Sequence, residues 1–440
     1  MLRYTLLVAA LLVFRPGWAG AQAVDSTTRE LIEKLQSRID SLEKRVAELE
    51  KEKAETRAPM AAPAQAAPTA AATVQAAHMH DQAPVPSTTA QEATQPIYPL
   101  LKINGFSDFN FSATNLHGAN GGFQTQTLLG AHSGFEEGQF TLHLSSALSP
   151  KVSVFGEVTL TARSDAGTGT PAAPGFNAEV ERIIVRYDLN DYLKLSFGRY
   201  HTPINYWNTA FHHGEWLQTT ISRPEMTQFG GSFIPVHFVG SLLEGQAPAG
   251  GLNLNYNFGV GNGRGQVLSR AGDFGDINNN RAWLFNSFIK PDRLFGLRVG
   301  GSVYHDEISP ASGVPTREWI ESANLVWTKE TPEVIAEFAN VHHQPIHGLV
   351  NSNSQAFYVQ AAYRLPWFKR QWKPYYRFEY IHVPQSDTLF RPLVPSFHAS
   401  TVGVRYDISS FAAFKFEYRD YSRRGLPGIR GFFTQTSFTF

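Results

Sequence analysis

Apolar and polar residues alternate in many stretches of the chain between Leu101 and Phe440. In one stretch the apolar residues occupy every second position, with charged residues between them: Phe414, Lys415, Phe416, Glu417, Tyr418 and Arg419. A period of two is typical of a β-strand with one apolar face and one polar face. The pattern predicts sixteen strands, near residues 102–112, 135–148, 151–163, 177–189, 192–200, 230–244, 251–261, 281–290, 295–305, 319–329, 333–342, 354–365, 372–383, 398–408, 411–421 and 430–440.

The links between these strands alternate between short and long. Short links occur at 149–150, 190–191, 245–250, 291–294, 330–332, 366–371 and 409–410. Long links fall between them, and the longest is His201 to Phe229. Because most predicted strands reach the roughly 9–11 residues that a tilted span of a bilayer needs, we expect an all-β fold: a sixteen-stranded antiparallel transmembrane β-barrel. A soluble sandwich also alternates its faces and is the competing interpretation, although it has no reason to separate short links from long ones.

The first residues of the chain predict export. Residues 1–23 have a basic start at Arg3, an apolar run from Leu6 to Phe14 and small residues around Ala21. That run is too short for a spanning helix, which needs about 20 residues, so we interpret it as a cleavable signal peptide.

A heptad pattern follows in residues 25–56 and predicts a short α-helical coiled coil. Its apolar seam is Ile32, Leu35, Ile39, Leu42, Val46 and Leu49, spaced alternately by three and four residues. β-Branched residues at one seam position and leucine at the other nominally favour a two-stranded coil, but three heptads are a weak determinant and a large partner domain can impose three strands. A lone solvated helix is the alternative.

Residues 57–96 are rich in alanine, proline, glutamine and threonine and predict a disordered linker. The barrel is expected to occupy residues 97–440.

Composition narrows the functional classes. The chain has 38 Lys+Arg against 38 Asp+Glu, no cysteine, 17% charged residues and 13% aromatic residues. The balanced charge gives no electrostatic signature for nucleic acid, and the absence of cysteine excludes disulfide scaffolds and thiolate metal sites. A charge-poor, aromatic-rich chain with a mean hydropathy of -0.24 suits a barrel with one wet face and one apolar face.

The chain ends on an aromatic strand, with Phe438 and Phe440 on one face. Together with the heptad segment and the stretch from Phe197 to Pro203, this end resembles the Gram-negative outer-membrane porin superfamily, in particular phosphate-selective porins O and P and trimeric porins with an N-terminal coiled coil. The resemblance implies a location in the outer membrane, contact with its lipid, a periplasmic coiled coil and a homotrimer. It also implies that Phe438 and Phe440 form the assembly signal.

Strand parity predicts which charges face the lumen. The main inward-facing cations are expected to be Arg182, Arg186, Lys194, Arg298, Arg377, Arg405 and Arg419. Over all the predicted strands, parity places 13 cations and six acids on the inward faces, so a mild anion preference follows unless the charges pair along the wall.

The longest link has the composition of a constriction loop, because Trp207, Phe211, Trp216 and Leu217 suit packing against the inner wall. The predicted constriction residues are His212, His213, Glu215, Arg223 and Glu225. A loop that caps the barrel from outside, or contacts a neighbouring subunit, is the other possibility.

We therefore expect a passive channel for small hydrophilic solutes or anions, without enzymatic activity, metal or cofactor. The histidines at 212–213 and at 342, 343 and 347 lack the helical spacing of a zinc site, and no nucleophile motif is present. Two alternatives remain: a plugged barrel that binds a partner at the cell surface, and a barrel enzyme.

Overall fold

The structure is a computed structural model that describes residues 98–116, 133–162, 176–211, 213–228, 233–348 and 350–440. The predicted signal peptide (1–23), coiled coil (25–56) and linker (57–96) lie outside the described residues. These three segments therefore stay predictions.

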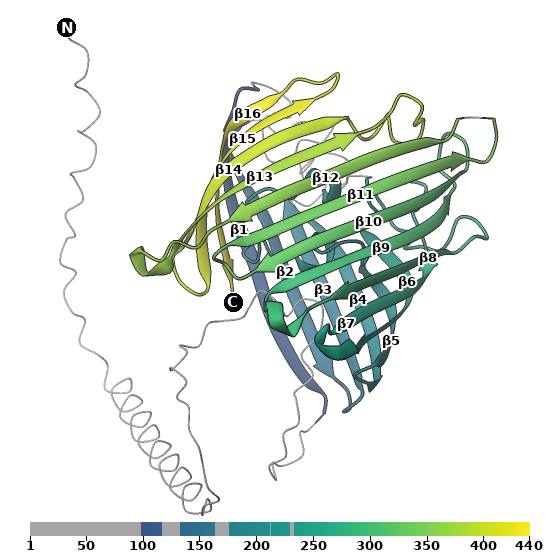
Figure 1. The fold of residues 1–440 in the computed structure, drawn as a ribbon, viewed down its shortest axis with the longest axis horizontal. Coiled ribbons are helices and arrows are strands. Elements are labelled where there is room, and N and C mark those ends of the chain that lie inside the picture. Colours follow the sequence, from purple (N-terminus) through teal and green to yellow (C-terminus); the bar gives the residue numbers. More distant parts are fainter. Residues whose placement is uncertain (1–97, 117–132, 163–175, 212, 229–232, 349) are drawn as a thin grey trace, which may run out of the picture. The chain divides into compact units, whose positions relative to one another are not determined.

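Sixteen strands make up the described fold (Figure 1). Their bounds are β1 Leu100–Thr114, β2 Phe135–Ala147, β3 Val152–Ala162, β4 Phe176–Asn190, β5 Leu193–His201, β6 His237–Ala247, β7 Leu254–Asn262, β8 Ala282–Ile289, β9 Leu297–Ile308, β10 Thr316–Thr328, β11 Glu333–Pro345, β12 Ser352–Ala362, β13 Trp372–His382, β14 Phe397–Asp407, β15 Ala412–Arg423 and β16 Ile429–Thr439.

Each strand pairs antiparallel with its neighbours in the chain, and the first and last strands close the ring. In the closing pair Phe106 lies opposite Thr439, and Thr114 lies opposite Gly431. The predicted sixteen-stranded antiparallel barrel is confirmed. Closure leaves no strand with an unpaired edge, which removes the main route to aggregation of an open sheet.

Among the described residues, helices are confined to the links: α2 Trp207–Ala210 and the 3₁₀ turns η2 Glu225–Thr227, η3 Ala249–Gly251, η4 Asp292–Leu294 and η5 Phe368–Arg370. In the described part of the chain, no helix has the length and apolar character that a membrane crossing requires.

The two faces of the barrel wall differ as the alternation predicts. In β12, Phe357 and Val359 point outward and are 38% and 44% exposed, whereas Tyr358 and Gln360 point inward and are 1% exposed. Large apolar side chains are exposed on the outside of most strands, and a water-soluble monomer rarely leaves so much apolar surface uncovered. The apolar band is what a lipid-facing barrel presents.

The start of β6 was predicted wrongly. The sequence pattern placed this strand at 230–244, but it begins at His237. Phe233 and Ile234 are adjacent and both buried, 2% and 1% exposed, because they pack in the core of the barrel interior instead of alternating across a wall.

The separation of link lengths is also less strict than predicted. The link at 424–428 belongs to the long-link end of the barrel but is shorter than the link at 363–371 at the opposite end. The reason is that β15 continues further than the apolar alternation suggested, to Arg423, whereas β12 ends earlier, at Ala362. We call the two ends of the barrel the loop end and the turn end.

Candidate functional site

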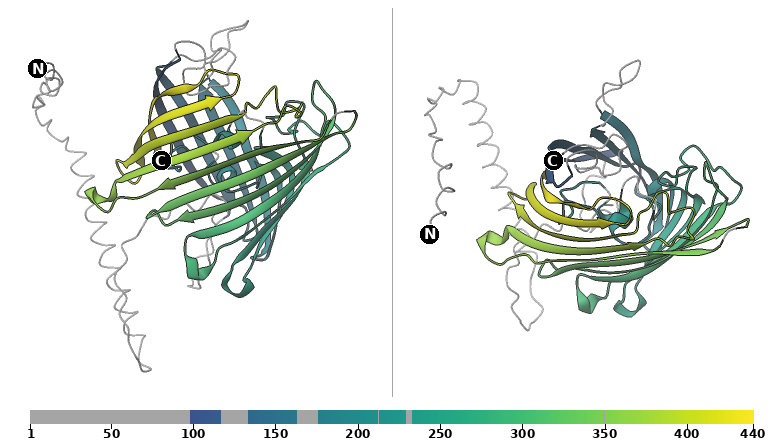
Figure 2. Two further views of the ribbon diagram at one scale, coloured as in Figure 1. Left: turned by 45° about the horizontal axis from the view of Figure 1, so that its top comes forward. Right: turned by 90° about the horizontal axis from the view of Figure 1, so that it is seen from above.

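The link between β5 and β6 folds into the barrel. This inner segment comprises residues 202–236, of which the structure describes 202–211, 213–228 and 233–236. Seen along the barrel, it lies inside the ring of strands (Figure 2, right). Most of its described residues are buried, and Trp207 is 0% exposed.

Aromatic packing fixes the start of the inner segment. Trp207 packs edge-on against Phe211, with ring centroids 4.9 Å apart, and against Tyr358 of β12 at 6.0 Å. The guanidinium of Arg298, on β9, lies 5.1 Å from the ring centroid of Tyr206. Such contacts bury large apolar area and add roughly 0.5–1.5 kcal/mol per aromatic pair.

Acidic side chains of the wall accept hydrogen bonds from the backbone of the inner segment. Oε1 of Glu337, on β11, accepts from the amides of Tyr206 and Trp207, each at 2.7 Å. Oε2 of Glu417, on β15, accepts from the amide of Ile221 at 3.0 Å. These backbone donors would otherwise be buried without partners, at a cost of about 1–3 kcal/mol each.

Basic side chains of the wall bind the carbonyl groups of the same segment. Nη1 of Arg377, on β13, donates to the carbonyl oxygen of Ser222 at 2.8 Å. Nη1 of Arg405, on β14, donates to the carbonyl oxygens of Trp216 and Gln218 at 2.6 and 2.9 Å. The wall charges thus serve as anchors for the inner segment.

Two cavities lie in the described part of the barrel interior, and their linings share no residue. The turn-side cavity has a volume of about 690 Å³ and reaches Asp191, Tyr192 and Ser410 in the short turns. The loop-side cavity has a volume of about 500 Å³ and reaches Ser269 and Arg270 in a long link. They lie towards opposite ends of the barrel.

A cluster of histidines and carboxylates lies where the two cavities approach each other, and we call it the neck. Its members are His143, His201, His213, His237, Glu157 and Glu181. His143 and His201 line the turn-side cavity, whereas His213 and His237 line the loop-side cavity. The ring centroid of His201 is 5.5 Å from that of His237 and 6.1 Å from that of His213.

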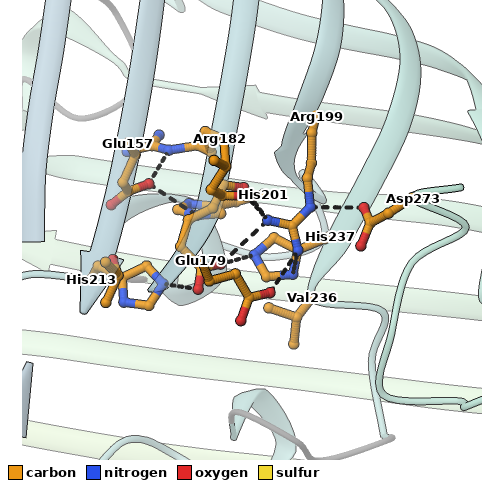
Figure 3. A network of polar contacts seen from close by, with 12 residues as sticks. Glu157, Glu179, Arg182, Arg199, His201, His213, Val236, His237 and Asp273 are labelled. Atoms are coloured by element: carbon orange, nitrogen blue, oxygen red, sulfur yellow. Dashed lines mark hydrogen bonds and ion pairs between the residues drawn. The ribbon is translucent and has the colours of Figure 1, made fainter. Parts of the chain in front are cut away.

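Hydrogen bonds and ion pairs hold the neck together (Figure 3). Nε2 of His143 and Nε of Arg182 lie 2.8 and 2.6 Å from the two carboxylate oxygens of Glu157. Nε2 of His237 and Nε2 of His213 lie 2.8 and 3.3 Å from the carboxylate of Glu181. The side chains come from β2, β3, β4, β5, β6 and the inner segment, so the neck joins the segment to one wall.

Arg199 supports the neck from β5. Its Nε donates to Asp273 at 2.8 Å, its Nη1 to the carbonyl oxygen of Glu181 at 2.7 Å, and its Nη2 to Glu179 at 3.2 Å (Figure 3). A guanidinium with a planar fork of donors suits this role, because it satisfies several acceptors in fixed directions.

The predicted constriction residues lie around the loop-side cavity. His213, Glu215, Arg223 and Glu225 line it, and His212 lies outside the described residues. Nη2 of Arg223 donates to the carbonyl oxygen of Thr227 at 2.9 Å.

Two titratable groups of the inner segment are shifted. Burial lowers the pKa of Arg223 to about 10, partly offset by the charges of Glu215 and Glu181. Burial, followed by the negative charge of Asp108, raises the pKa of Glu215 to about 8.

The predicted lumen cations fall into two groups. Arg182, Arg186, Lys194 and Arg298 line the turn-side cavity, and Arg419 lines the loop-side cavity. Arg377 and Arg405 also point inward, but the inner segment covers them and takes up their donors.

Sequence reasoning missed most of the neck. His143, His237 and Glu181 belong to no motif. Inward parity on predicted strands was the signal available for His143 and His237, whereas Glu181 lies at a β-bulge against β3 that breaks the parity of β4. Arg199 and His201 lay in the stretch from Phe197 to Pro203, which was used only for a resemblance. Their contacts join the consecutive strands β2 to β6 with the inner segment, and the periodicity of a single strand does not report such contacts.

Among the histidines at 342, 343 and 347, the structure gives His343 a defined environment. Its Nε2 lies 3.0 Å from Oε2 of Glu318, and its Nδ1 lies 3.0 Å from Oδ1 of Asp387. Within the described ranges, no group of three or more His, Cys, Asp or Glu side chains is arranged to hold a metal ion.

Comparison with solved structures identifies the fold. An anion-selective porin from Comamonas acidovorans matches with a TM-score of 0.52 and 11% identity, covering 78% of this chain and 100% of that one. The chain has the fold of bacterial porins. OmpF from Salmonella typhi, in complex with daunomycin, matches with a TM-score of 0.50 and 12% identity, covering 77% of this chain and 97% of that one. The trimer form of OmpT, an outer-membrane protein from Vibrio cholerae, matches with a TM-score of 0.50 and 10% identity, covering 78% of this chain and 99% of that one. No family model and no curated protein matches the sequence.

Proposed function

We propose that the protein is an outer-membrane porin: a water-filled channel for passive diffusion of small hydrophilic solutes. The observation that carries this proposal is a closed sixteen-stranded barrel, apolar outside, with two cavities inside it that are lined by many charged side chains. A polar lumen lowers the barrier that the hydrocarbon core presents to a hydrated solute, and the charges along it decide which ions are retained. The porin fold, which one structural neighbour shares as an anion-selective porin, supports the same function.

Transport without catalysis is part of the proposal. Each strongly charged cluster described above has a structural task, either holding the inner segment or closing the neck. Ester or lipid turnover by the pure protein would contradict this part of the proposal.

We further propose a mild anion preference. This preference is supported by basic residues that line the turn-side cavity, the larger of the two in volume: Arg182, Arg186, Lys194 and Arg298. In planar bilayers under a salt gradient, the reversal potential should have the sign expected when anions are more permeant than cations. Arg223→Ala should shift it towards the value expected for cations. A wild-type reversal potential of zero would mean equal permeability to anions and cations and would contradict the anion preference.

The assembly is proposed to be a homotrimer, with the heptads of residues 25–56 in the periplasm. The trimer form of one structural neighbour supports this stoichiometry. Phe438 and Phe440 are proposed as the assembly signal. Sedimentation of the detergent-solubilised protein, with and without proline in place of Leu42, tests the contribution of the coiled coil: a smaller oligomer is expected for the variant.

Single-channel recording in planar bilayers tests the channel itself. Insertion of the purified protein is expected to give discrete steps of ionic current. A membrane that stays silent, although the barrel is folded and inserted, would contradict the proposal.

A further inference from the structure

Most of the charged residues that line the turn-side cavity are basic. Six of its lining residues are basic: Lys102, Arg182, Arg186, Lys194, Lys290 and Arg298. Its acidic lining residues are Asp191 and Glu244. Lys102 and Lys194 form no close ion pair with any residue in the described part of the chain, although Lys194 lies opposite Asp188 and Glu244 in the neighbouring strands.

Most of the charged residues that line the loop-side cavity are acidic. Its acidic lining residues are Asp108, Glu136, Glu179, Glu181, Glu215 and Glu225. Its basic lining residues are Arg223, Arg270 and Arg419. The acid excess remains with Glu215 in its protonated form.

The neck separates these two charge distributions. Its own charges are paired at short range, as in Arg182 with Glu157 at 2.6 Å, so the sign of the fixed charge changes from one side of it to the other. At an ionic strength of about 0.1 M the Debye length is roughly 10 Å, so the lining charges of each cavity act mainly within that cavity. The low-dielectric barrel wall strengthens their effect on ions inside.

We propose that the two cavities act as oppositely charged vestibules in series, which makes the channel rectify ionic current and favours small zwitterionic solutes. This inference rests on the proposed channel function. Cations concentrate in the loop-side cavity and anions concentrate in the turn-side cavity. A zwitterion that enters from the loop end is oriented with its carboxylate leading, towards Lys102 and Lys194, and its ammonium group facing the acidic cavity behind it.

Rectification follows from the series arrangement. When the loop end is positive, cations move from the acidic cavity and anions move from the basic cavity towards the neck, so mobile charge accumulates there and conductance rises. When the polarity is reversed, both ions leave the neck and it is depleted. The larger current should therefore flow with the loop end positive.

The first test is the current–voltage curve of single channels of the full chain in planar bilayers. In about 0.1 M KCl we expect roughly a twofold current difference between equal positive and negative voltages, falling towards unity in about 1 M KCl, where the Debye length is about 3 Å. Channels inserted in opposite directions should give mirror-image curves. Open channels with symmetric curves at low salt would overturn the inference while leaving the channel function intact, whereas a silent membrane would overturn both.

Charge reversal tests which residues are responsible. The double variant Lys102→Glu and Lys194→Glu changes the sign of two unpaired lining charges and should abolish the low-salt asymmetry. Lys151→Glu is the matched control, because Lys151 is exposed in a short turn and lines neither cavity. An asymmetry that survives the double variant, or that Lys151→Glu removes equally, would contradict the assignment.

Solute uptake tests the ligand class. Proteoliposomes should swell faster in 4-aminobutanoate than in the neutral 4-hydroxybutanamide of similar size. The Lys102→Glu and Lys194→Glu variant should remove this advantage, since it leaves no basic excess for the carboxylate. Equal swelling in the two solutes for wild type would overturn the zwitterion preference.

Discussion

Arg377, on β13, donates from Nη2 to the carbonyl oxygen of Arg223 in the inner segment, at 3.0 Å. The same guanidinium binds Ser222 and, through Nε at 2.8 Å, the carboxylate of Glu379. A single wall side chain therefore holds the inner segment at the point where it borders the loop-side cavity. This relationship makes the wall charges part of the architecture of the lumen.

Arg377→Met should loosen the inner segment and destabilise the barrel. Methionine keeps much of the apolar stem but removes every donor, which leaves Glu379 without its guanidinium. Breaking one partner of a buried pair costs about 3–5 kcal/mol. We expect a lower denaturation midpoint and larger current noise in the open channel. Arg430→Met is the control, since Arg430 pairs with Asp420 on the exposed surface. Unchanged noise and stability would show that Arg377 does not anchor the segment.

The charge of the loop-side cavity should depend on pH through Glu215. Its pKa is raised to about 8 by burial and by Asp108, so its carboxyl is protonated at neutral pH and ionises in alkaline solution. Raising the pH from about 6.5 to about 9 should move the reversal potential towards the cation side, since an ordinary glutamate, with a pKa of about 4.3, is already ionised over that range. Because the folded state holds this proton more tightly, Glu215 should also lower stability as the pH rises from about 4.3 to 8.

Glu215→Gln is the variant that isolates this effect. It should remove the pH-dependent shift of the reversal potential, whereas Glu321→Gln, at an exposed position of β10, should retain it. A shift of equal size in Glu215→Gln would assign the titration to another group.

The strands were predictable because their signal is local. In β15 the inward Lys415 and Glu417 alternate with the outward Phe414 and Phe416. Such an alternation depends only on which face of a single strand is polar and which is apolar. Closure then follows from the number of strands and their antiparallel order. The start of β6 was misjudged for a related reason: Phe233 and Ile234 pack inside the barrel, and an apolar segment of this kind resembles a strand in composition.

The neck and the anchors were not predictable, because they depend on pairs far apart in sequence. Glu337 binds the amide of Trp207 across 130 residues, and Glu181 meets His213 and His237 from different elements. Nothing in the sequence near Glu337 indicates a partner. Parity placed Arg182 and Arg377 in the lumen, but it gave no means to distinguish a charge that lines a cavity, as Arg182 does, from one that the inner segment covers, as with Arg377.

Closure of the barrel should depend on the fit between Gly105 and the terminal Phe440. The two residues exchange backbone hydrogen bonds, at 2.9 and 3.0 Å. A Cβ on residue 105 would lie 2.2 Å from the ring of Phe440, so even alanine must displace that ring. We expect Gly105→Ala to lower the fraction of heat-modifiable, folded barrel on a denaturing gel.

A double-mutant cycle isolates this contact. In a Phe440→Ala background, Gly105→Ala should have little further effect, because the ring that it displaces is gone. Gly156→Ala is the matched control, since its Cβ would meet only Leu144, at an ordinary 4.0 Å. Equal losses from Gly105→Ala with and without Phe440 would mean that the glycine serves another purpose.

The route of ions through the barrel should pass His213. Its ring lies between the inner segment and the wall, with Nδ1 2.9 Å from Gln139 and Nε2 3.3 Å from Glu181, at the boundary of the two cavities. The natural chain has no cysteine, so His213→Cys introduces a unique thiol. A small, positively charged thiol reagent should then lower the single-channel current in one step, because it adds bulk and positive charge at the boundary of the two cavities. Ala311→Cys, exposed in a long link, should react without changing the current. A current that stays constant after His213→Cys is fully modified would place the ion path elsewhere in the lumen.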